Sequence, residues 1–300
     1  MTDRAGSREM RRLGKLARAM IQPFARRPWL IRPLMRSGLL ARDFPLPRRT
    51  RRELSTELRR VQGRKVWTLA PKDAARDAPL ILYLHGGAYV CGITTVHWHF
   101  LTSLAQRSAV IEVPLYGLGP KHDFREAYAL LDELWAGIAQ RHPGRPVTIM
   151  GDSAGGGLAL GFALHLRDSG RSLPESLVLL SPWVDIASTD PQVDERRQDD
   201  PMLARAGAEL AAKVWANGAD PDDPRLSPMN GDLTGLPPTD IYQGTRDMLR
   251  PQVEALADKL RAAGVRVDLT LCPGGLHVYP IFDTPESKAA RDRISARLAG

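Results

Sequence analysis

Short apolar runs alternate with longer amphipathic stretches along most of the chain. From about Arg64 onward, six runs are predicted to be strands: residues 80–84, 109–113, 147–150, 177–180, 240–243 and 267–271. Apolar residues at helical spacing predict helices over residues 96–107, 123–141, 154–168, 252–263 and 288–298. This alternation predicts an α/β fold with a mostly parallel central sheet and helices on both faces.

Two segments depart from this alternation. Residues 185–228 are rich in Asp and Pro and contain one predicted helix, over residues 204–215, as expected of an insertion that covers one end of the sheet. Before the first sheet signal, at residues 64–69, residues 10–24 carry an apolar stripe at helical spacing. The stripe consists of Leu13, Leu16, Ala17, Met20 and Phe24.

The charge is concentrated in the N-terminal part. Residues 1–65 hold 19 Lys and Arg against 5 Asp and Glu, whereas residues 66–300 hold 23 against 29. A basic amphipathic helix can lie on an anionic membrane, or it can pack its stripe onto the domain and leave its basic face in solvent. We favour packing, because solvated basic faces are common and periodicity does not say what the stripe covers.

Composition narrows the class of protein. With 300 residues, 43% hydrophobic and 25% charged, the chain is typical of a globular protein that buries a core. No apolar run approaches the roughly 18 residues of a membrane-spanning helix, and basic residues interrupt every window that could serve as a secretory signal. Cys91 and Cys272 cannot form a disulfide framework. We therefore expect a cytoplasmic protein, and the absence of zinc spacing or an RNA-binding signature argues against nucleic acid as a partner.

The first candidate catalytic motif follows the predicted strand at residues 147–150. Gly151-Asp152-Ser153-Ala154-Gly155 fits the pattern G-x-S-x-G, in which a serine sits on a sharp turn between a strand and a helix. Small flanking residues are needed because side chains there would collide with neighbouring backbone. Ser153 is the candidate nucleophile. The alternative is an ordinary glycine-rich turn.

A second glycine-rich loop follows the predicted strand at residues 80–84. Acyl transfer needs backbone N–H donors where negative charge develops, and His85-Gly86-Gly87 resembles the loop that supplies them in lipases and esterases. Gly86 and Gly87, with Ala154, are the predicted oxyanion donors. His85 is interpreted as a structural residue of this loop.

The acid and the base must follow Ser153 in the chain. His277 alone among the histidines comes after the last predicted strand, in a glycine-rich loop. Asp247 follows the strand at residues 240–243 through a short turn and would orient His277. Asp258 and Asp268 fall in a predicted helix and strand, where the geometry is poor.

These motifs together resemble the hormone-sensitive lipase family of α/β-hydrolases, also called bacterial family IV or GDXG esterases. The resemblance covers roughly residues 65–300. Besides the two glycine-rich motifs it rests on residues 181–185 (S-P-W-V-D), 200–203 (D-P-M-L), 227–228 (S-P), 235–238 (G-L-P-P) and 247–250 (D-M-L-R). It implies an α/β-hydrolase fold with a helical cap built from N-terminal helices and an insertion after the sixth strand. We accordingly expect residues 1–63 to form a basic helical segment of the cap and residues 64–300 the catalytic domain, with the cap insertion at about 186–226.

The chain also departs from the family pattern. Ala88 replaces the third glycine of H-G-G-G, and residues 116–121 read Y-G-L-G-P-K where the family has Y-R-L-A-P-E. The usual acidic residue after D-P-L-R is replaced by Pro251 or Gln252. The triad stays intact, whereas Gly117 and Lys121 have no explanation in the sequence.

The predicted function is a serine carboxylic-ester hydrolase that forms an acyl-enzyme with short- to medium-chain or small cyclic esters. Neither a cofactor nor a metal is predicted, since no ligand cluster appears. A lactonase or amidase of the same fold stays open, as does a non-catalytic ligand receptor on the same scaffold, although such receptors typically lose a triad member. Besides the small-molecule ester, a homodimer and a peripheral contact with anionic membrane also stay open as partners.

Overall fold

The predicted strands assemble into one sheet. The computed structural model describes residues 6–298 except 76, 108, 143 and 188–199. Within these residues eight strands pair in the order β1-β2-β4-β3-β5-β6-β7-β8. They are β1 (Ser55–Val61), β2 (Arg64–Ala70), β3 (Leu80–Leu84), β4 (Val110–Pro114), β5 (Val147–Asp152), β6 (Ser176–Leu180), β7 (Thr239–Gly244) and β8 (Val267–Cys272).

The six strands from β3 to β8 run parallel, and β2 is antiparallel to both β1 and β4. Every residue of β3, β4 and β5 is buried, as expected of strands covered on both faces by helices. The predicted α/β-hydrolase fold with its mostly parallel sheet is therefore confirmed.

The strand β1 lies inside the segment expected to be helical. It joins β2 through Gln62 and Gly63, whose positive φ angles of 46° and 75° suit a two-residue hairpin turn. The sheet thus begins at Ser55 rather than near Arg64. Because β1 is an edge strand whose residues are all exposed or half-buried and mostly polar or charged, it lacks the apolar run by which the other strands were predicted.

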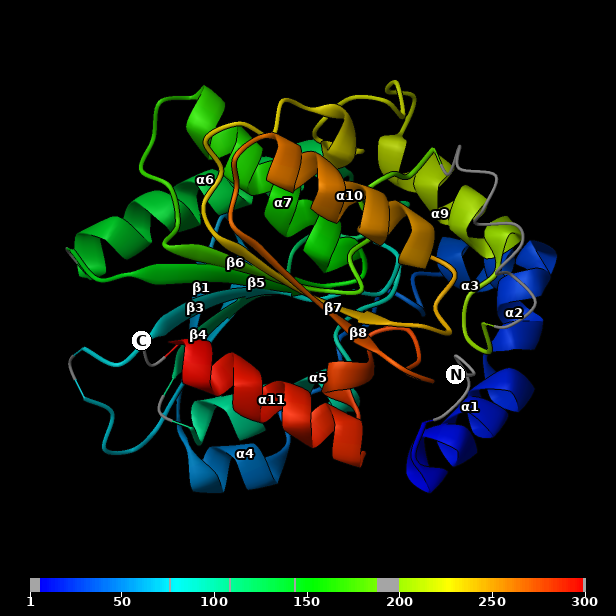
Figure 1. The fold of residues 1–300 in the computed structure, drawn as a ribbon, viewed down its shortest axis with the longest axis horizontal. Coiled ribbons are helices and arrows are strands. Elements are labelled where there is room, and N and C mark those ends of the chain that lie inside the picture. The colour runs from blue at the N-terminus through cyan, green and yellow to red at the C-terminus, as the bar shows by residue number, and fades with distance from the viewer. Residues whose placement is uncertain (1–5, 76, 108, 143, 188–199, 299–300) are drawn as a thin grey trace.

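Helices cover both faces of the sheet (Figure 1). In the view of Figure 1, α6, α7 and α10 lie on one side and α4, α5 and α11 on the other. The bounds are α4 (Arg48–Glu53), α5 (Thr95–Ala105), α6 (Phe124–Arg141), α7 (Ala154–Asp168), α10 (Arg250–Ala262) and α11 (Pro285–Leu298), with short 3₁₀ turns η1 (Pro228–Asn230) and η2 (Tyr279–Ile281).

A group of helices stands at the right of Figure 1, toward which β7 and β8 point. It consists of α1 (Arg8–Met20), α2 (Gln22–Arg26), α3 (Pro28–Arg36) and α9 (Arg205–Ala216), and both α2 and α3 contact α9. The insertion expected at about 186–226 supplies α9, and its residues 188–199 lie outside the described part. Because functional residues of an α/β sheet gather at the carboxyl ends of its strands, this group lies beside the expected site.

The N-terminal helix is anchored but does not pack as predicted. Ser7 caps α1 by accepting a hydrogen bond from Met10 N–H and also bonds to Glu286 of α11. The buried line of α1 is Met10, Gly14 and Ala17. Of the predicted stripe only Ala17 is buried and Leu13 half-buried, whereas Leu16, Met20 and Phe24 are exposed. The expectation that the whole stripe packs onto the domain is therefore wrong. Across the described residues, no helix combines the length and apolarity that crossing a bilayer requires.

Candidate active site

Ser153 occupies a strained turn between β5 and α7. Its φ of 51° and ψ of −121° place a non-glycine residue at positive φ, which costs roughly 1–3 kcal/mol. The surrounding backbone holds it there: Ser153 N–H donates to the Leu180 carbonyl at 2.8 Å, and the Ser153 carbonyl accepts from Trp183 N–H at 2.9 Å. The hydroxyl therefore projects from a fixed position.

The flanking glycines are required by close backbone approach. A Cβ at Gly155 would lie 2.0 Å from the Leu84 carbonyl oxygen, and a Cβ at Gly151 would lie 2.2 Å from the Gly155 carbonyl oxygen. Real Cβ atoms do not come this near to backbone, so the turn excludes any side chain at these two positions.

The structure brings Ser153, His277 and Asp247 together. His277 Nε2 lies 2.8 Å from Ser153 Oγ, and His277 Nδ1 lies 2.8 Å from Asp247 Oδ2. Asp247 Oδ1 accepts from Leu249 N–H at 2.9 Å, which fixes the carboxylate. The rival carboxylates point elsewhere, since Asp258 pairs with Arg261 and Asp268 with Arg293.

Burial and charge set the protonation of this pair. Burial alone would lower the pKa of His277, but the Asp247 carboxylate, with further help from Asp200 and Asp152, raises that pKa above its ordinary value. Burial would raise the pKa of Asp247, whereas His277 and the hydrogen bonds lower it on balance. Ionised Asp247 accepts a hydrogen bond from the protonated Nδ1 of His277. In the neutral ring Nε2 then carries no proton, so it can accept the hydrogen bond of the Ser153 hydroxyl.

Backbone strain gathers around this triad. Seven non-glycine residues of the described chain have positive φ. Five of them lie in the loops that follow β3, β5, β6 and β8: Ala88, Tyr89, Ser153, Ser181 and Val278. The last two are linked, because Val278 N–H donates to Ser181 Oγ at 2.9 Å and so holds the turn that follows His277.

In the loop after β3, one of the predicted oxyanion donors already has a hydrogen-bond acceptor. Gly86 N–H donates to Asp152 Oδ1 at 2.8 Å, so this donor is already used and does not face an oxyanion. Among the described residues, none accepts a hydrogen bond from the N–H groups of Gly87, Ala88 or Ala154. The N–H groups of Gly87 and Ala154 are therefore available as predicted, and the N–H of Ala88 is available where that of Gly86 is not.

His85 lies beneath this loop and does not reach the triad. Its ring is fully buried and stacks on Tyr116 with centroids 4.6 Å apart, while the Tyr116 hydroxyl donates to the His85 carbonyl at 2.5 Å. Burial, with a smaller contribution from His97, lowers the pKa of His85 to about 4. A neutral, enclosed imidazole fits the predicted structural role.

Asp152 is a site residue that the sequence analysis did not single out. Its buried carboxylate accepts from Gly86 N–H, from the Tyr83 hydroxyl at 2.5 Å, and from His97 Nε2 at 3.3 Å. His97 Nδ1 accepts from Thr94 N–H, which leaves the ring proton on Nε2. Burial would raise the pKa of Asp152, but these partners lower it on balance. Because successive side chains of a strand point to opposite faces, the side chain of Asp152 points away from the Ser153 hydroxyl and lies under the loop that carries Gly86.

Asp200 was also missed as part of the site. It is fully buried, and its Oδ2 accepts from Met248 N–H at 2.8 Å, directly beside Asp247. Burial and then the charge of Asp247 raise the pKa of Asp200 to about 6. Its backbone carbonyl accepts from Gln22 Nε2 at 2.5 Å, so the helix α2 is connected to the acid end of the triad.

An aromatic stack joins the insertion helix to the oxyanion loop. The rings of Tyr89 and Trp215 lie parallel, with centroids 4.3 Å apart and 1° between their planes. Trp183, which follows β6, also stacks on Tyr89, with centroids 5.9 Å apart. The helix α9 therefore supports the loop that carries Gly87 and Ala88.

One departure from the family pattern has a packing cause. A Cβ at Gly117 would lie 2.6 Å from Arg64 Nη2 and 2.7 Å from Glu126 Oε1, and these two residues form an ion pair. The pair fills the space that a side chain at Gly117 would need. Lys121 is exposed, and nothing in the structure explains it.

The described residues contain neither a disulfide bond nor a metal-binding cluster. Cys91 and Cys272 are both free thiols. In the described ranges, no group of three or more His, Cys, Asp or Glu side chains is placed to hold a metal ion.

Fold and site together define a serine hydrolase. A family described as having the alpha/beta hydrolase fold matches residues 81–281. An acetyl-hydrolase of Streptomyces hygroscopicus is 34% identical over 237 residues, covering 76% of this chain and 77% of that protein. The crystal structure of EstE5, soaked with p-nitrophenyl butyrate, superposes with a TM-score of 0.85 at 29% identity and covers 98% of both chains.

A further crystal structure makes the assignment more specific. It is an esterase from the bacterial hormone-sensitive lipase family, with a TM-score of 0.81, 29% identity and 98% coverage of both chains. The chain belongs to the hormone-sensitive lipase family of α/β-hydrolases.

Proposed function

We propose that this protein hydrolyses short- to medium-chain or small cyclic esters through an acyl-enzyme on Ser153. The chain is a carboxylic-ester hydrolase, and its substrate is a small-molecule ester. The observation that supports an acyl-enzyme on Ser153 is the unbroken line of hydrogen bonds from Asp247 through His277 to Ser153.

In the proposed mechanism, Ser153 Oγ attacks the ester carbonyl while His277 Nε2 takes the hydroxyl proton. Asp247 stabilises the imidazolium that forms, without itself taking a proton. The N–H groups of Gly87, Ala88 and Ala154 then stabilise the oxyanion. His277 gives its proton to the leaving alcohol, and a water activated by the same imidazole releases the acid and restores Ser153.

We also propose that α1, α2, α3 and α9 form the cap and limit the size of the acyl group. Two contacts support this: Gln22 of α2 donates to Asp200 beside the triad, and Trp215 of α9 stacks on Tyr89 of the oxyanion loop. An apolar cover strengthens the oxyanion contacts by excluding water. Short acyl groups also fit the name of the acetyl-hydrolase and the butyrate ester soaked into EstE5.

Two further properties are part of the proposal. A cytoplasmic location is supported by the two free cysteines. We also propose that the active protein can form a homodimer, which light scattering would detect.

A substrate panel tests the proposed function. Purified protein is assayed on p-nitrophenyl esters from acetate to dodecanoate, together with lactones and anilides, and Ser153→Ala serves as the matched control. The proposal expects kcat/KM to be highest on the shorter esters and to be lost in the control. Faster turnover of anilides, or turnover that survives Ser153→Ala in a folded protein, would contradict it.

A further inference from the structure

The N-terminal helices expose an unusual concentration of large apolar side chains. Ten large hydrophobic residues of the described chain are exposed, and five of them fall within residues 16–29. They are Leu16 (57% exposed), Met20 (63%), Ile21 (46%), Phe24 (48%) and Trp29 (66%). Scattered single apolar residues need no explanation, whereas such a cluster marks an interaction surface.

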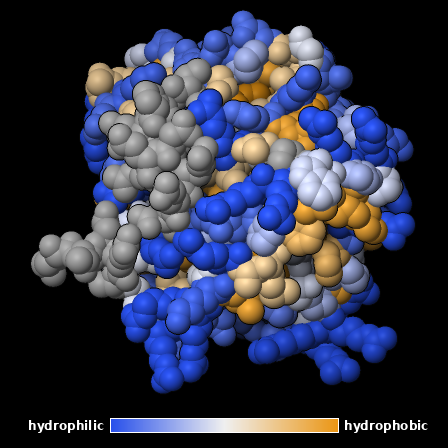
Figure 2. Space-filling model, turned by 90° about the vertical axis from the view of Figure 1, so that its right-hand side faces the viewer, coloured by the Kyte–Doolittle hydropathy of each residue, from blue (hydrophilic) through white to orange (hydrophobic). Residues whose placement is uncertain are grey.

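This apolar cluster is surrounded by positive charge. The helices α1 to α3 span residues 8–36, which hold nine Lys and Arg, all exposed, against one acidic residue, Glu9. Within the part of the chain that the structure describes, no carboxylate pairs with Arg12, Lys15, Arg26, Arg27, Arg32 or Arg36. We call these five apolar and nine basic residues the N-terminal face. Figure 2 views the molecule from this side and shows apolar side chains gathered among hydrophilic ones.

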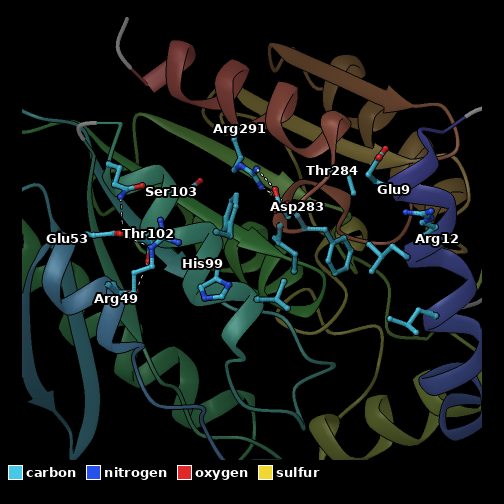
Figure 3. A pocket seen from close by; sticks show the side chains of 18 residues that line it. Glu9, Arg12, Arg49, Glu53, His99, Thr102, Ser103, Asp283, Thr284 and Arg291 are labelled. Atoms are coloured by element: carbon cyan, nitrogen blue, oxygen red, sulfur yellow. Dashed lines mark hydrogen bonds and ion pairs between the residues drawn. The ribbon is translucent and has the colours of Figure 1, made fainter.

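A neighbouring groove helps to delimit the face. A groove of about 760 Å³ opens between α1, α4, α5 and η2 (Figure 3), and Leu16 is one of its lining residues. Carboxylates and guanidinium groups both stand around it: Glu9, Glu53 and Asp283 with Arg12, Arg49 and Arg291. The groove therefore has no selective charge, and the part of the surface that attracts anions is the outer side of α1 to α3.

We propose that the N-terminal face docks on an anionic phospholipid membrane surface. Helices that lie in the membrane interface combine Trp, Phe and Leu on one side with Lys and Arg on the other, and α1 to α3 show both. The apolar residues would enter the acyl boundary while the basic residues meet the lipid phosphates.

Two other occupants fit the face less well. A second copy of this chain would bring nine positive charges against nine others, which opposes association through this face. A purely electrostatic acidic partner would use the basic residues but would leave Met20, Phe24 and Trp29 in water. An anionic bilayer satisfies both features.

Docking would also place the membrane beside the site. The helix α2 carries Phe24 on its outer side, and its Gln22 donates to Asp200 next to Asp247. Esters dissolved in the bilayer would then reach the enzyme from the surface on which it rests. The docking itself does not depend on the proposed function, because vesicle binding is measured without substrate.

Cosedimentation with vesicles tests the proposal. The 300-residue protein is mixed with vesicles of phosphatidylcholine alone or with roughly 30% phosphatidylglycerol, whose anionic headgroups give the surface a negative potential. We expect binding to the anionic vesicles only, and we expect it to weaken as NaCl is raised. Equal binding to both vesicle types, or binding to neither, overturns the proposal.

Two double variants separate charge from apolar contact. Arg26→Gln with Arg27→Gln is expected to reduce partitioning roughly thirty-fold, since each basic residue near an anionic surface contributes on the order of 1 kcal/mol. Phe24→Ser with Trp29→Ser is expected to reduce it roughly ten-fold or more. A matched control, Leu58→Ser with Arg60→Gln on the exposed strand β1, is expected to bind like the unmodified protein.

Unfolding midpoints and light scattering complete the test. All variants alter exposed side chains, so their unfolding midpoints should match that of the unmodified protein. The proposal is overturned if folded N-terminal variants bind like the control. It is equally overturned if the unmodified protein is a dimer that the N-terminal variants convert to monomer, because the face would then be an interface between copies.

Discussion

Asp200 Oδ2 accepts a hydrogen bond of 2.8 Å from the N–H of Met248, the residue that follows Asp247. A second buried carboxylate therefore fixes the turn that carries the acid of the triad. Its charge also acts on His277, whose pKa it helps to raise. Asp200 is thus a positioning residue with an electrostatic effect that a pH profile can detect.

Removal of this charge should shift the pH dependence of catalysis. The active form needs neutral His277, so activity falls as pH drops through the raised pKa of His277. Asp200→Asn removes one of the charges that raise this pKa, and the acidic limb of kcat/KM against pH should move to lower pH. The surface variant Asp268→Asn is the control and should leave the limb in place. An unmoved limb in folded Asp200→Asn would show that the role of Asp200 is only structural.

Ser153→Ala should lower kcat by on the order of a million-fold, because the attacking oxygen is lost. The fold should persist, since the turn is held by backbone hydrogen bonds rather than by the hydroxyl. Ester turnover and the mass added by a phosphonate inhibitor are the measurements. Labelling of a folded Ser153→Ala protein at another serine would refute the nucleophile assignment.

Asp247→Asn should cost roughly ten- to a hundred-fold less in kcat than His277→Ala. Asp247 orients and stabilises the imidazole, whereas His277 moves the proton in both half-reactions. Steady-state kinetics on one soluble ester compare the two variants. Wild-type turnover by Asp247→Asn would mean that Asp200 or another carboxylate can hold His277.

Gly155→Ala should destabilise the protein by roughly 2–4 kcal/mol, because its Cβ would meet the Leu84 carbonyl at 2.0 Å. Gly137→Ala in α6 is the matched control. There the nearest atom is the far end of the Arg141 side chain rather than backbone, and loss of glycine inside a helix should stabilise by roughly 0.5–1 kcal/mol. Urea unfolding compares them, and equal midpoints would contradict the close contact.

Trp215→Ala should change acyl preference, because Tyr89 loses the ring that holds the oxyanion loop against α9. The same variant should lose roughly 3–5 kcal/mol of stability, since Trp215 is buried. Trp215→Phe keeps an aromatic ring and provides a folded comparison. The ratio of kcat/KM for acetate and hexanoate esters is the readout. An unchanged ratio in both variants would exclude α9 from the acyl pocket.

The sequence was most informative where burial or close approach restricts residue choice. The central strands are apolar on both faces, so β3 and its neighbours were visible as continuous runs. Ser153 was predicted from a turn pattern that needs glycine at positions 151 and 155. Asp247 and His277 were predicted from chain order and from their place after a strand.

Features that depend on tertiary contacts were missed. Gly86 and Asp152 are 66 residues apart, and their hydrogen bond, which removes one predicted donor, leaves no local pattern. The burial of Asp200 likewise depends on how the insertion folds back. In α1, periodicity indicated an apolar line at Leu16 and Met20, whereas the helix packs through Met10, Gly14 and Ala17, whose small residues permit closer approach.

The carboxylate of Asp152 has a consequence for the thermodynamics of turnover. It is covalently next to Ser153 and hydrogen-bonded to Gly86, so one anchor ties the nucleophile and the anion-binding loop into a single rigid unit. The loss of chain entropy needed to align them occurs once, during folding, and is not repeated with each substrate. The acylation step should consequently show a small activation entropy, and loosening this anchor should make that entropy more negative.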